Sequence, residues 1–483
     1  MQLVNLFIKA VEVYGSDRVG MVTYTRAAAA EVKSRVAAHF GVDASAFPWV
    51  STIHAACYKL LGSPSLVDGR RGKFKQFCQS LNLAVPPEVK DTANDVSPYW
   101  YSEHVNTDEI SQFRAIFAQA AHEMAPPKRG EMTRARYDYL ALRYRQWKES
   151  ERILDFEDLL IEGAKHELPV RVLLLDEAQD SSALMWHVVE SWKRSAVFFA
   201  ASADPWQSIF SYIGADPGLF TRHVNDAPGS LVALGDSHRL TPLSAQYAQN
   251  ILTAGGWNDT DSKLLATWDG VGRSDREDSG STFYLARTHR LLVPVQERLE
   301  EMGVPYSNLK GYSPLTTIAG KTYRALMTLR EGGTVSLQEL QSISKTCNRP
   351  LPGIQSVEYP ELLDAEAVVR ILGKDISAMA ASVPHAYYLR AVYQQHGLHG
   401  LIAPPKVMVG SIHAAKGREA DTTYLITSWG TLPARALRGD GRRAEACVAY
   451  VAASRHRQAL HLIEGARGER YPFGAAPVHT PRT

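Results

Sequence analysis

Short apolar runs recur along the chain, and each is followed by a polar loop and then by a helical pattern. These runs span residues 19–25, 172–175, 196–201, 282–286, 407–411 and 422–426. Apolar runs rich in β-branched residues are typical of parallel strands that are buried on both faces. Because the runs fall into an early set and a late set, the pattern predicts an α/β protein with two sheet-containing domains.

Between the first and the second of the early apolar runs the pattern changes. The residues there have helical periodicity, with many basic and aromatic side chains. Aromatic and apolar residues recur at intervals of three, four and three, which places them on one helical face: Tyr137, Leu140, Tyr144 and Trp147. An irregular stretch with Pro and Gly interrupts the late runs in the same way. The predicted division is a first domain at 1–62 plus 151–245, its helical insertion at 63–150, a second domain at 246–309 plus 405–483, and a smaller insertion at 310–404.

Composition and charge narrow the class of protein. The 483 residues include 53 Lys+Arg and 51 Asp+Glu, for a net charge of +2, with 45% hydrophobic and 22% charged residues. These globular values exclude a disordered chain. The sequence has no apolar run of about 18 residues and no signal-peptide pattern, so we expect no membrane span and a cytoplasmic location. The cysteines lie far apart, which excludes a disulfide framework and a cysteine zinc ribbon.

The segment 171–180 (RVLLLDEAQD) carries the clearest chemical signature. An apolar strand ends there at Asp176 and Glu177, and open parallel sheets bind ligands at the carboxyl ends of their strands. An aspartate in that position can hold Mg²⁺, and the neighbouring glutamate can orient or deprotonate a water molecule. A structural alternative remains open, because the helix dipole also favours carboxylates at a helix N-terminus.

The DEAQD sequence resembles motif II of the UvrD/Rep-type superfamily 1 helicases. Further segments resemble motifs of that family in the family's order: 23–35, 51–61, 155–160, 203–215, 234–241, 411–421 and 445–456. One short motif is weak support, whereas a collinear series along the chain is strong. The resemblance implies two RecA-like P-loop NTPase domains with helical insertions. It also implies an ATP-dependent DNA helicase or translocase with 3′-to-5′ polarity, acting on single-stranded or partly double-stranded DNA in replication, repair or recombination.

The resemblance further implies roles in ATP hydrolysis for residues of the first domain. Asp176 would hold Mg²⁺, and Glu177 would activate the attacking water. Gln207 matches the glutamine that senses the γ-phosphate of ATP in this family. A loop-capping glutamine is the structural alternative for that position.

Residues of the later motifs would complete the nucleotide site. Arg239 and Arg455 match arginines that reach the triphosphate in this family, and Glu419 matches an acid near the ribose. An arginine at the transferred phosphoryl group can raise the rate by roughly a thousand-fold or more. The alternatives are solvated surface arginines and a carboxylate at a helix N-terminus.

A single-strand DNA path is the last implication of the resemblance. Phe210 and Tyr212 match aromatic residues that stack on bases, which is a sequence-independent contact. Positions that match contacts to the DNA backbone are Thr25, Arg26, His54 and His413. Without the motifs, burial in the core would be the preferred interpretation of the aromatic residues, and a structural role that of the histidines.

The sequence departs from the family in one consequential way, because the pattern G-x-x-x-x-G-K-[ST] occurs nowhere in it. Gly320-Lys321-Thr322 matches only the last part, since Leu315 stands where the first glycine is required. Without this phosphate loop, we expect the chain to bind ATP poorly and to hydrolyse it slowly or not at all. Two interpretations follow: a helicase whose start is set too far downstream, or an ATPase-deficient single-stranded DNA-binding or scaffolding protein on a helicase fold.

Overall fold

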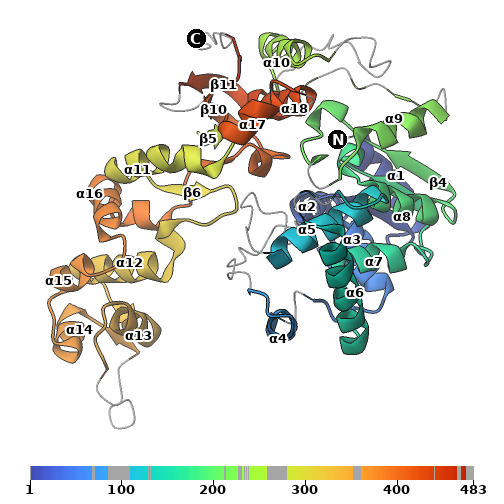
Figure 1. Ribbon diagram of the computed structural model, residues 1–483. Helices are drawn as coiled ribbons and strands as arrows, with labels where there is room; N and C mark the ends of the chain where they lie inside the picture. The colour runs from blue at the N-terminus through green and yellow to red at the C-terminus, as the bar shows by residue number, and fades with distance from the viewer. Residues whose placement is uncertain are drawn as a thin grey trace. The chain divides into compact units, whose positions relative to one another are not determined.

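A computed structural model gives the fold of the chain, which divides into two compact units, Met1–Ala233 and Leu234–Thr483 (Figure 1). Each unit contains its own parallel sheet, so the predicted α/β class is confirmed. The finer division into four parts stays a prediction. No helix among the described residues has the length and apolar character needed to cross a membrane. The structure describes residues 2–67, 71–84, 109–128, 130, 132–211, 214–226, 231–232, 234, 237, 239–257, 280–351, 361–439, 441–464 and 469–474.

The first unit has a four-stranded parallel sheet in the order β2-β1-β3-β4. Alternate residues of the central strands enter two different cores: Leu174 packs on one face of the sheet, and Leu173 and Leu175 pack on the other. Both faces are therefore covered, as expected for a parallel sheet. The strands are β1 (Val19–Thr23), β2 (Val50–Thr52), β3 (Val172–Leu175) and β4 (Phe198–Ala201).

Strand β4 is less protected than β1 and β3, because it is an outer strand of the sheet. Phe198 is 47% exposed and Val197 is 53% exposed, although both are apolar. The helices of this part of the unit are α1 (Gln2–Tyr14), α2 (Arg26–Phe40), α3 (Ile53–Leu60), α7 (Phe156–Gly163), α8 (Ala183–Lys193) and α9 (Pro217–Asp226).

Three further helices of the first unit enclose an aromatic core. They are α4 (Arg71–Ser80), α5 (Glu109–Glu123) and α6 (Arg134–Glu151). Phe77, Phe113 and Tyr144 are buried there, and their rings lie 5.8 Å apart in two pairs that share Tyr144. The predicted apolar face of α6 is confirmed, because Tyr137 and Leu140 are buried and Trp147 packs against the same cluster.

The second unit has a five-stranded parallel sheet in the order β11-β10-β5-β9-β6. Helices α10 and α18 pack closely, because a Cβ atom added at Gly255 would lie 2.1 Å from the Cβ atom of Ala446. The strands are β5 (Thr282–Ala286), β6 (Tyr306–Asn308), β9 (Val407–Ser411), β10 (Ala420–Ile426) and β11 (His456–Ile463). The helices beside this sheet are α10 (Pro242–Ala254), α11 (Val293–Glu301), α17 (Thr431–Ala436) and α18 (Arg442–Ala453).

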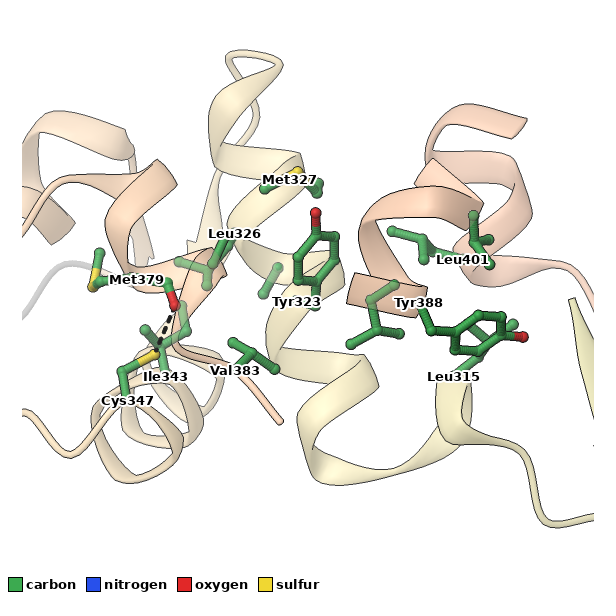
Figure 2. Close-up of a cluster of buried hydrophobic side chains, with 14 of the residues drawn as sticks. Leu315, Tyr323, Leu326, Met327, Ile343, Cys347, Met379, Val383, Tyr388 and Leu401 are labelled. Carbon is green, nitrogen blue, oxygen red and sulfur yellow. Dashed lines mark hydrogen bonds between the residues drawn. The ribbon is translucent and has the colours of Figure 1, made fainter. Parts of the chain in front are cut away.

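A helical bundle lies between β6 and β9 in the sequence, and Figure 2 shows its core. Leu326, Ile343 and Val383 are buried there, and the Cys347 thiol donates to the Met379 carbonyl oxygen at 3.7 Å. The helices are α12 (Ile318–Arg330), α13 (Leu337–Thr346), α14 (Ala365–Leu372), α15 (Ile376–Ala381) and α16 (Ala386–Ile402). A hairpin pairs β7 (Val335–Ser336) with β8 (Leu362–Leu363) in antiparallel fashion.

The Gly-Lys-Thr sequence at 320–322 belongs to this bundle and is helical. Gly320 lies in the first turn of α12, where its N–H donates to the side chain of the N-cap residue Thr317 at 3.1 Å. Thr322 is buried, and its hydroxyl lies 3.1 Å from the Thr346 hydroxyl. This segment is thus part of a packed helix, and its glycine allows close packing instead of cradling a phosphate.

Gly320→Ala is expected to destabilise the second unit by about 1–3 kcal/mol, the usual cost of overpacking. The added Cβ would lie 2.4 Å from the carbonyl oxygens of both Pro314 and Leu315, which belong to the 3-10 helix η9 (Pro314–Thr316) just before α12. Gly72→Ala in α4 is the control, because a Cβ there meets nothing within 4 Å. Urea unfolding of both variants measures the difference, and an unchanged midpoint for Gly320→Ala would reject this account.

Candidate functional site

The carboxyl end of β3 places two acidic side chains at the edge of the first sheet. The Asp176 N–H donates to the Val22 carbonyl oxygen at 2.9 Å, which continues the β1–β3 pairing to the strand end. Its carboxylate accepts a hydrogen bond from the Ser202 hydroxyl, just after β4. Burial raises the pKa of Asp176, and the negative charge of Glu177 raises it further. A cation near this pair would relieve the repulsion between the carboxylates.

Glu177 connects to Gln207 through two intermediate residues, Gln179 and Asp204. The Gln179 side-chain amide donates to the Glu177 carboxylate at 2.6 Å, and its carbonyl oxygen accepts from the Asp204 N–H at 3.1 Å. The Gln207 amide donates to the Asp204 carboxylate at 2.7 Å. The structure thus brings together two residues that the sequence places in separate motifs.

Gln179 and Asp204 are functional candidates that sequence reasoning missed. Gln179 is fully buried, and a buried amide must find hydrogen-bond partners. Asp204 is the N-cap of a short 3-10 helix, η5 (Pro205–Gln207), and its carboxylate also accepts from the Trp206 N–H at 3.1 Å. Both residues lie inside segments that resemble family motifs, which is the signal that the sequence offers. A glutamine or an aspartate does not by itself indicate which group it will form a hydrogen bond with.

The predicted DNA contacts of the first unit occupy the start of α2 and α3. The Thr25 hydroxyl accepts from the Ala28 N–H at 3.1 Å, so it caps α2, while Arg26 is exposed at the first position of that helix. His54 is only 7% exposed, and its Nε2 has no hydrogen-bond partner among the described residues. Burial lowers the pKa of His54 to about 3, helped by His122 and Arg26, so the ring is neutral at pH 7.

Phe210 lies against Tyr24, with ring centroids 5.0 Å apart, and both rings contact Ala118 of α5. Tyr24 immediately follows β1 and was not assigned from the sequence. Its position beside Thr25 was the available signal. Tyr212 lies outside the described residues, so the predicted aromatic pair reduces to Phe210.

The nucleotide-site residues predicted in the second unit also lie near one another. Arg239 Nη1 is 3.8 Å from Glu419 Oε2. Arg455 is 1% exposed, and its guanidinium donates to the carbonyl oxygens of Val451 at 2.9 Å and Arg418 at 3.3 Å. Arg455 therefore has a structural hydrogen-bonding role in this unit.

His413 is half-buried and begins a 3-10 helix, η11 (His413–Ala415), directly after β9.

The buried carboxylate of Glu445 fixes the position of helix α18, which leads to Arg455. Arg287 donates to both of its oxygens at 2.9 Å, and the Trp429 indole N–H donates to one of them. A bidentate arginine fixes the orientation of the carboxylate, so Arg287 anchors α18 to the end of β5. Sequence reasoning missed Arg287, because its partner is 158 residues away.

Comparisons with known proteins agree with this arrangement. The family model for the UvrD/REP helicase N-terminal domain matches residues 3–228. The chain is 26% identical to "ATP-dependent DNA helicase UvrD2" of Mycobacterium tuberculosis, over 86% of this chain and 67% of the relative. It is 25% identical to "ATP-dependent DNA helicase Rep" of Escherichia coli, over 50% of this chain and 37% of that one. Residues 3–228 therefore match the UvrD/REP helicase N-terminal domain family, and the collinear motifs, the parallel sheets and these relatives make the chain as a whole similar to UvrD/Rep-type helicases.

Proposed function

We propose that this chain is an ATP-driven helicase or translocase that moves along single-stranded DNA with 3′-to-5′ polarity. The hydrogen-bonded series from Glu177 through Gln179 and Asp204 to Gln207 carries the proposal. It joins a carboxylate that can act on water to an amide that can sense a phosphate, at the carboxyl ends of neighbouring parallel strands. Relatives named ATP-dependent DNA helicases support the same activity.

Asp176 is the residue that would hold Mg²⁺. Its carboxylate is partly buried beside a second carboxylate, and Mg²⁺ commonly binds one or two carboxylates and keeps its remaining positions for water and phosphate oxygens. A magnesium ion bound there would neutralise phosphate charge. Glu177 would then orient and deprotonate the attacking water, and Gln207 would contact the γ-phosphate.

Arg239, Arg455 and Glu419 would serve the nucleotide from the second unit. Arg239 and Glu419 are both partly exposed, so each can exchange its present partner for a ligand. Arg455 would have to leave its bonds to the Val451 and Arg418 carbonyl oxygens to reach a phosphate. We propose that nucleotide binding drives this exchange.

The DNA path would use Tyr24 and Phe210 as a stacking surface, and Tyr212 stays a further aromatic residue that the family resemblance predicts for it. Arg26 is exposed beside it and can neutralise a phosphate. His54 and His413 would be the contacts to the DNA backbone, and His54 would have to become accessible for this, because it is 7% exposed. Thr25 contributes by capping α2 and so fixing its first turn.

A second candidate function is an ATPase-deficient protein that binds single-stranded DNA or acts as a scaffold. The absence of G-x-x-x-x-G-K-[ST] from the 483 residues favours it, because that loop supplies the backbone N–H groups and the lysine that hold the phosphates. In this second candidate function, the DNA path binds single-stranded DNA and ATP is not required.

ATP hydrolysis by the purified 483-residue chain, with and without oligothymidylate, distinguishes the two candidates. Strand displacement from duplexes with a 3′ or a 5′ single-stranded tail is measured in parallel. DNA-stimulated hydrolysis with displacement from the 3′-tailed duplex supports the motor. Salt-dependent DNA binding without hydrolysis supports the second candidate, and the absence of DNA binding rejects both.

Phe210→Ala is expected to lower the affinity for oligothymidylate by about 5- to 150-fold, which corresponds to the 1–3 kcal/mol that stacking on one base contributes. Fluorescence anisotropy at one fixed salt concentration measures the change. Tyr14→Ala is the control, because Tyr14 is an exposed aromatic residue on α1 and is not part of the path. Equal affinities for the Phe210 variant and the wild type would mean that the Tyr24–Phe210 pair is core packing only.

A further inference from the structure

One face of α5 joins the proposed DNA path to the acidic strand end. Ala118 and His122 are one helical turn apart, so they share that face. Ala118 packs against Tyr24 and Phe210. His122 is 2% exposed, and α5 lies beside both α7 and α8 (Figure 1). None of the segments that resemble helicase motifs includes α5, so the family resemblance gives it no role.

The His122 ring is held on the side of the acidic strand end. Its Nδ1 lies 2.8 Å from the Ser182 hydroxyl, and its Nε2 lies 3.6 Å from a Glu157 carboxylate oxygen. Ser182 is the N-cap of α8, where its hydroxyl accepts from the Met185 N–H at 3.2 Å. A shift of the imidazole would therefore act directly on the cap of α8, a few residues after Glu177.

The same histidine lies beside His54, a predicted DNA contact, and beside Gly214. Its ring centroid is 6.4 Å from that of His54. A Cβ atom added at Gly214 would lie 3.1 Å from the His122 Cβ, so Gly214 packs closely against this residue. Gly214 has φ +86°, a conformation that favours glycine, and the close approach leaves little space for a larger residue.

We infer that His122 is a positioning residue that transmits occupancy of the DNA path to the acidic strand end. DNA on Tyr24 and Phe210 would press on the Ala118 face of α5, and His122 would carry the displacement to the Ser182 cap of α8. The inference rests on the proposed DNA path and adds to it a coupling residue outside the motifs. Coupling requires a physical element that both sites bias, and the element that we propose is the buried His122 ring with its contacts to Ser182 and Glu157.

Hydrogen exchange of the full chain, measured with and without saturating oligothymidylate, tests this. Peptides covering 23–28 and 207–211 report on the DNA path, and peptides covering 176–190 report on the strand end and α8. In the wild type, DNA is expected to slow exchange in both sets, by about 5-fold or more in 176–190, the lower end of common coupling strengths. In His122→Ala, the slowing persists in the path and falls below about two-fold in 176–190.

Two further variants separate coupling from simple structural damage. His122→Asn places a side-chain amide where the ring Nδ1 lies, 2.8 Å from the Ser182 hydroxyl, so it is expected to restore part of the slowing in 176–190. It also keeps the test valid if the alanine variant does not fold. Gln112→Ala, at an exposed position of α5, is expected to behave like the wild type.

Each remaining outcome overturns the inference. DNA that slows exchange in the path of the wild type but not in 176–190 would show that the two sites are independent. His122 variants that keep the full effect would show that another element carries it. If DNA slows exchange nowhere, the proposed DNA path fails first and the coupling fails with it, which anisotropy measurements would reveal independently.

Discussion

If the chain is the ATP-driven motor of the first candidate function, Glu177→Gln is expected to lower its DNA-stimulated ATP hydrolysis by about 10²- to 10⁴-fold, the usual contribution of a general base. The substitution removes the basic carboxylate and keeps its shape. The new side-chain carbonyl oxygen can still accept from the Gln179 amide, which donates to the Glu177 carboxylate at 2.6 Å. The left-handed backbone at this position, with φ 57°, imposes the same cost on either side chain. Affinity for single-stranded DNA should therefore remain unchanged.

Steady-state phosphate release at saturating oligothymidylate measures this effect, and anisotropy measures DNA affinity in the same samples. Glu167→Gln is the matched control, because Glu167 is an exposed carboxylate of the same unit. A Glu177 variant that hydrolyses ATP at the wild-type rate would show that Glu177 does not act in the hydrolysis step. A parallel loss of DNA affinity would mean that the substitution disturbs the fold around β3.

Lys148→Ala is expected to destabilise the first unit by about 3–5 kcal/mol, the usual cost of leaving a buried charge without its partner. Lys148 is buried on α6, and its ammonium donates to the carboxylates of both Asp155 and Asp158. Burial disfavours the charged form of Asp155, yet Lys148 holds its pKa below the usual range. Without the ammonium, two carboxylates would face each other at the start of α7.

The loss of stability caused by Lys148→Ala should become smaller as the pH falls. Burial, together with the charge of Asp155, raises the pKa of Asp158 to about 6, so this group takes up a proton as the pH falls through that value. Protonation removes the repulsion that Lys148→Ala creates. The stability difference between variant and wild type should therefore be largest above pH 7 and smaller at pH 5.

Urea unfolding at pH 8 and at pH 5, followed by circular dichroism, measures both the loss and its pH dependence. Lys165→Ala is the control, because Lys165 is exposed and its pair with Glu162 is worth less than about 1 kcal/mol. A loss that is equal for the two variants would contradict the buried-pair account. A loss at Lys148 that does not change with pH would exclude Asp158 as its source.

Local signals in the sequence predict the framework well and the side-chain connections poorly. The apolar run that ends at Asp176 forms β3, because strand formation depends on residues that are neighbours in the chain. The three-four-three spacing of α6 succeeds for the same reason. By contrast, His122 and Ser182 are 60 residues apart, and no pattern in either segment indicates that they meet.

Arg455 shows a second limit of sequence reasoning. Its motif implies a guanidinium at the triphosphate, which stays a prediction, and in the second unit this guanidinium donates to two carbonyl oxygens. Motif position identifies the residue type that a mechanism needs, but the partner that it holds in a given state depends on packing. Its proposed role therefore requires an exchange of partners, which sequence patterns do not describe.

The exposed outer strand β4 has a practical consequence for work in solution. An edge that offers unpaired backbone groups beside apolar side chains is a template on which another polypeptide can add a strand. Phe198 and Val197 give this edge such a character. Concentrated samples should therefore form oligomers and become turbid, with β4 as the contact between molecules. The binding and kinetic assays belong at low protein concentration, with light scattering as a routine check.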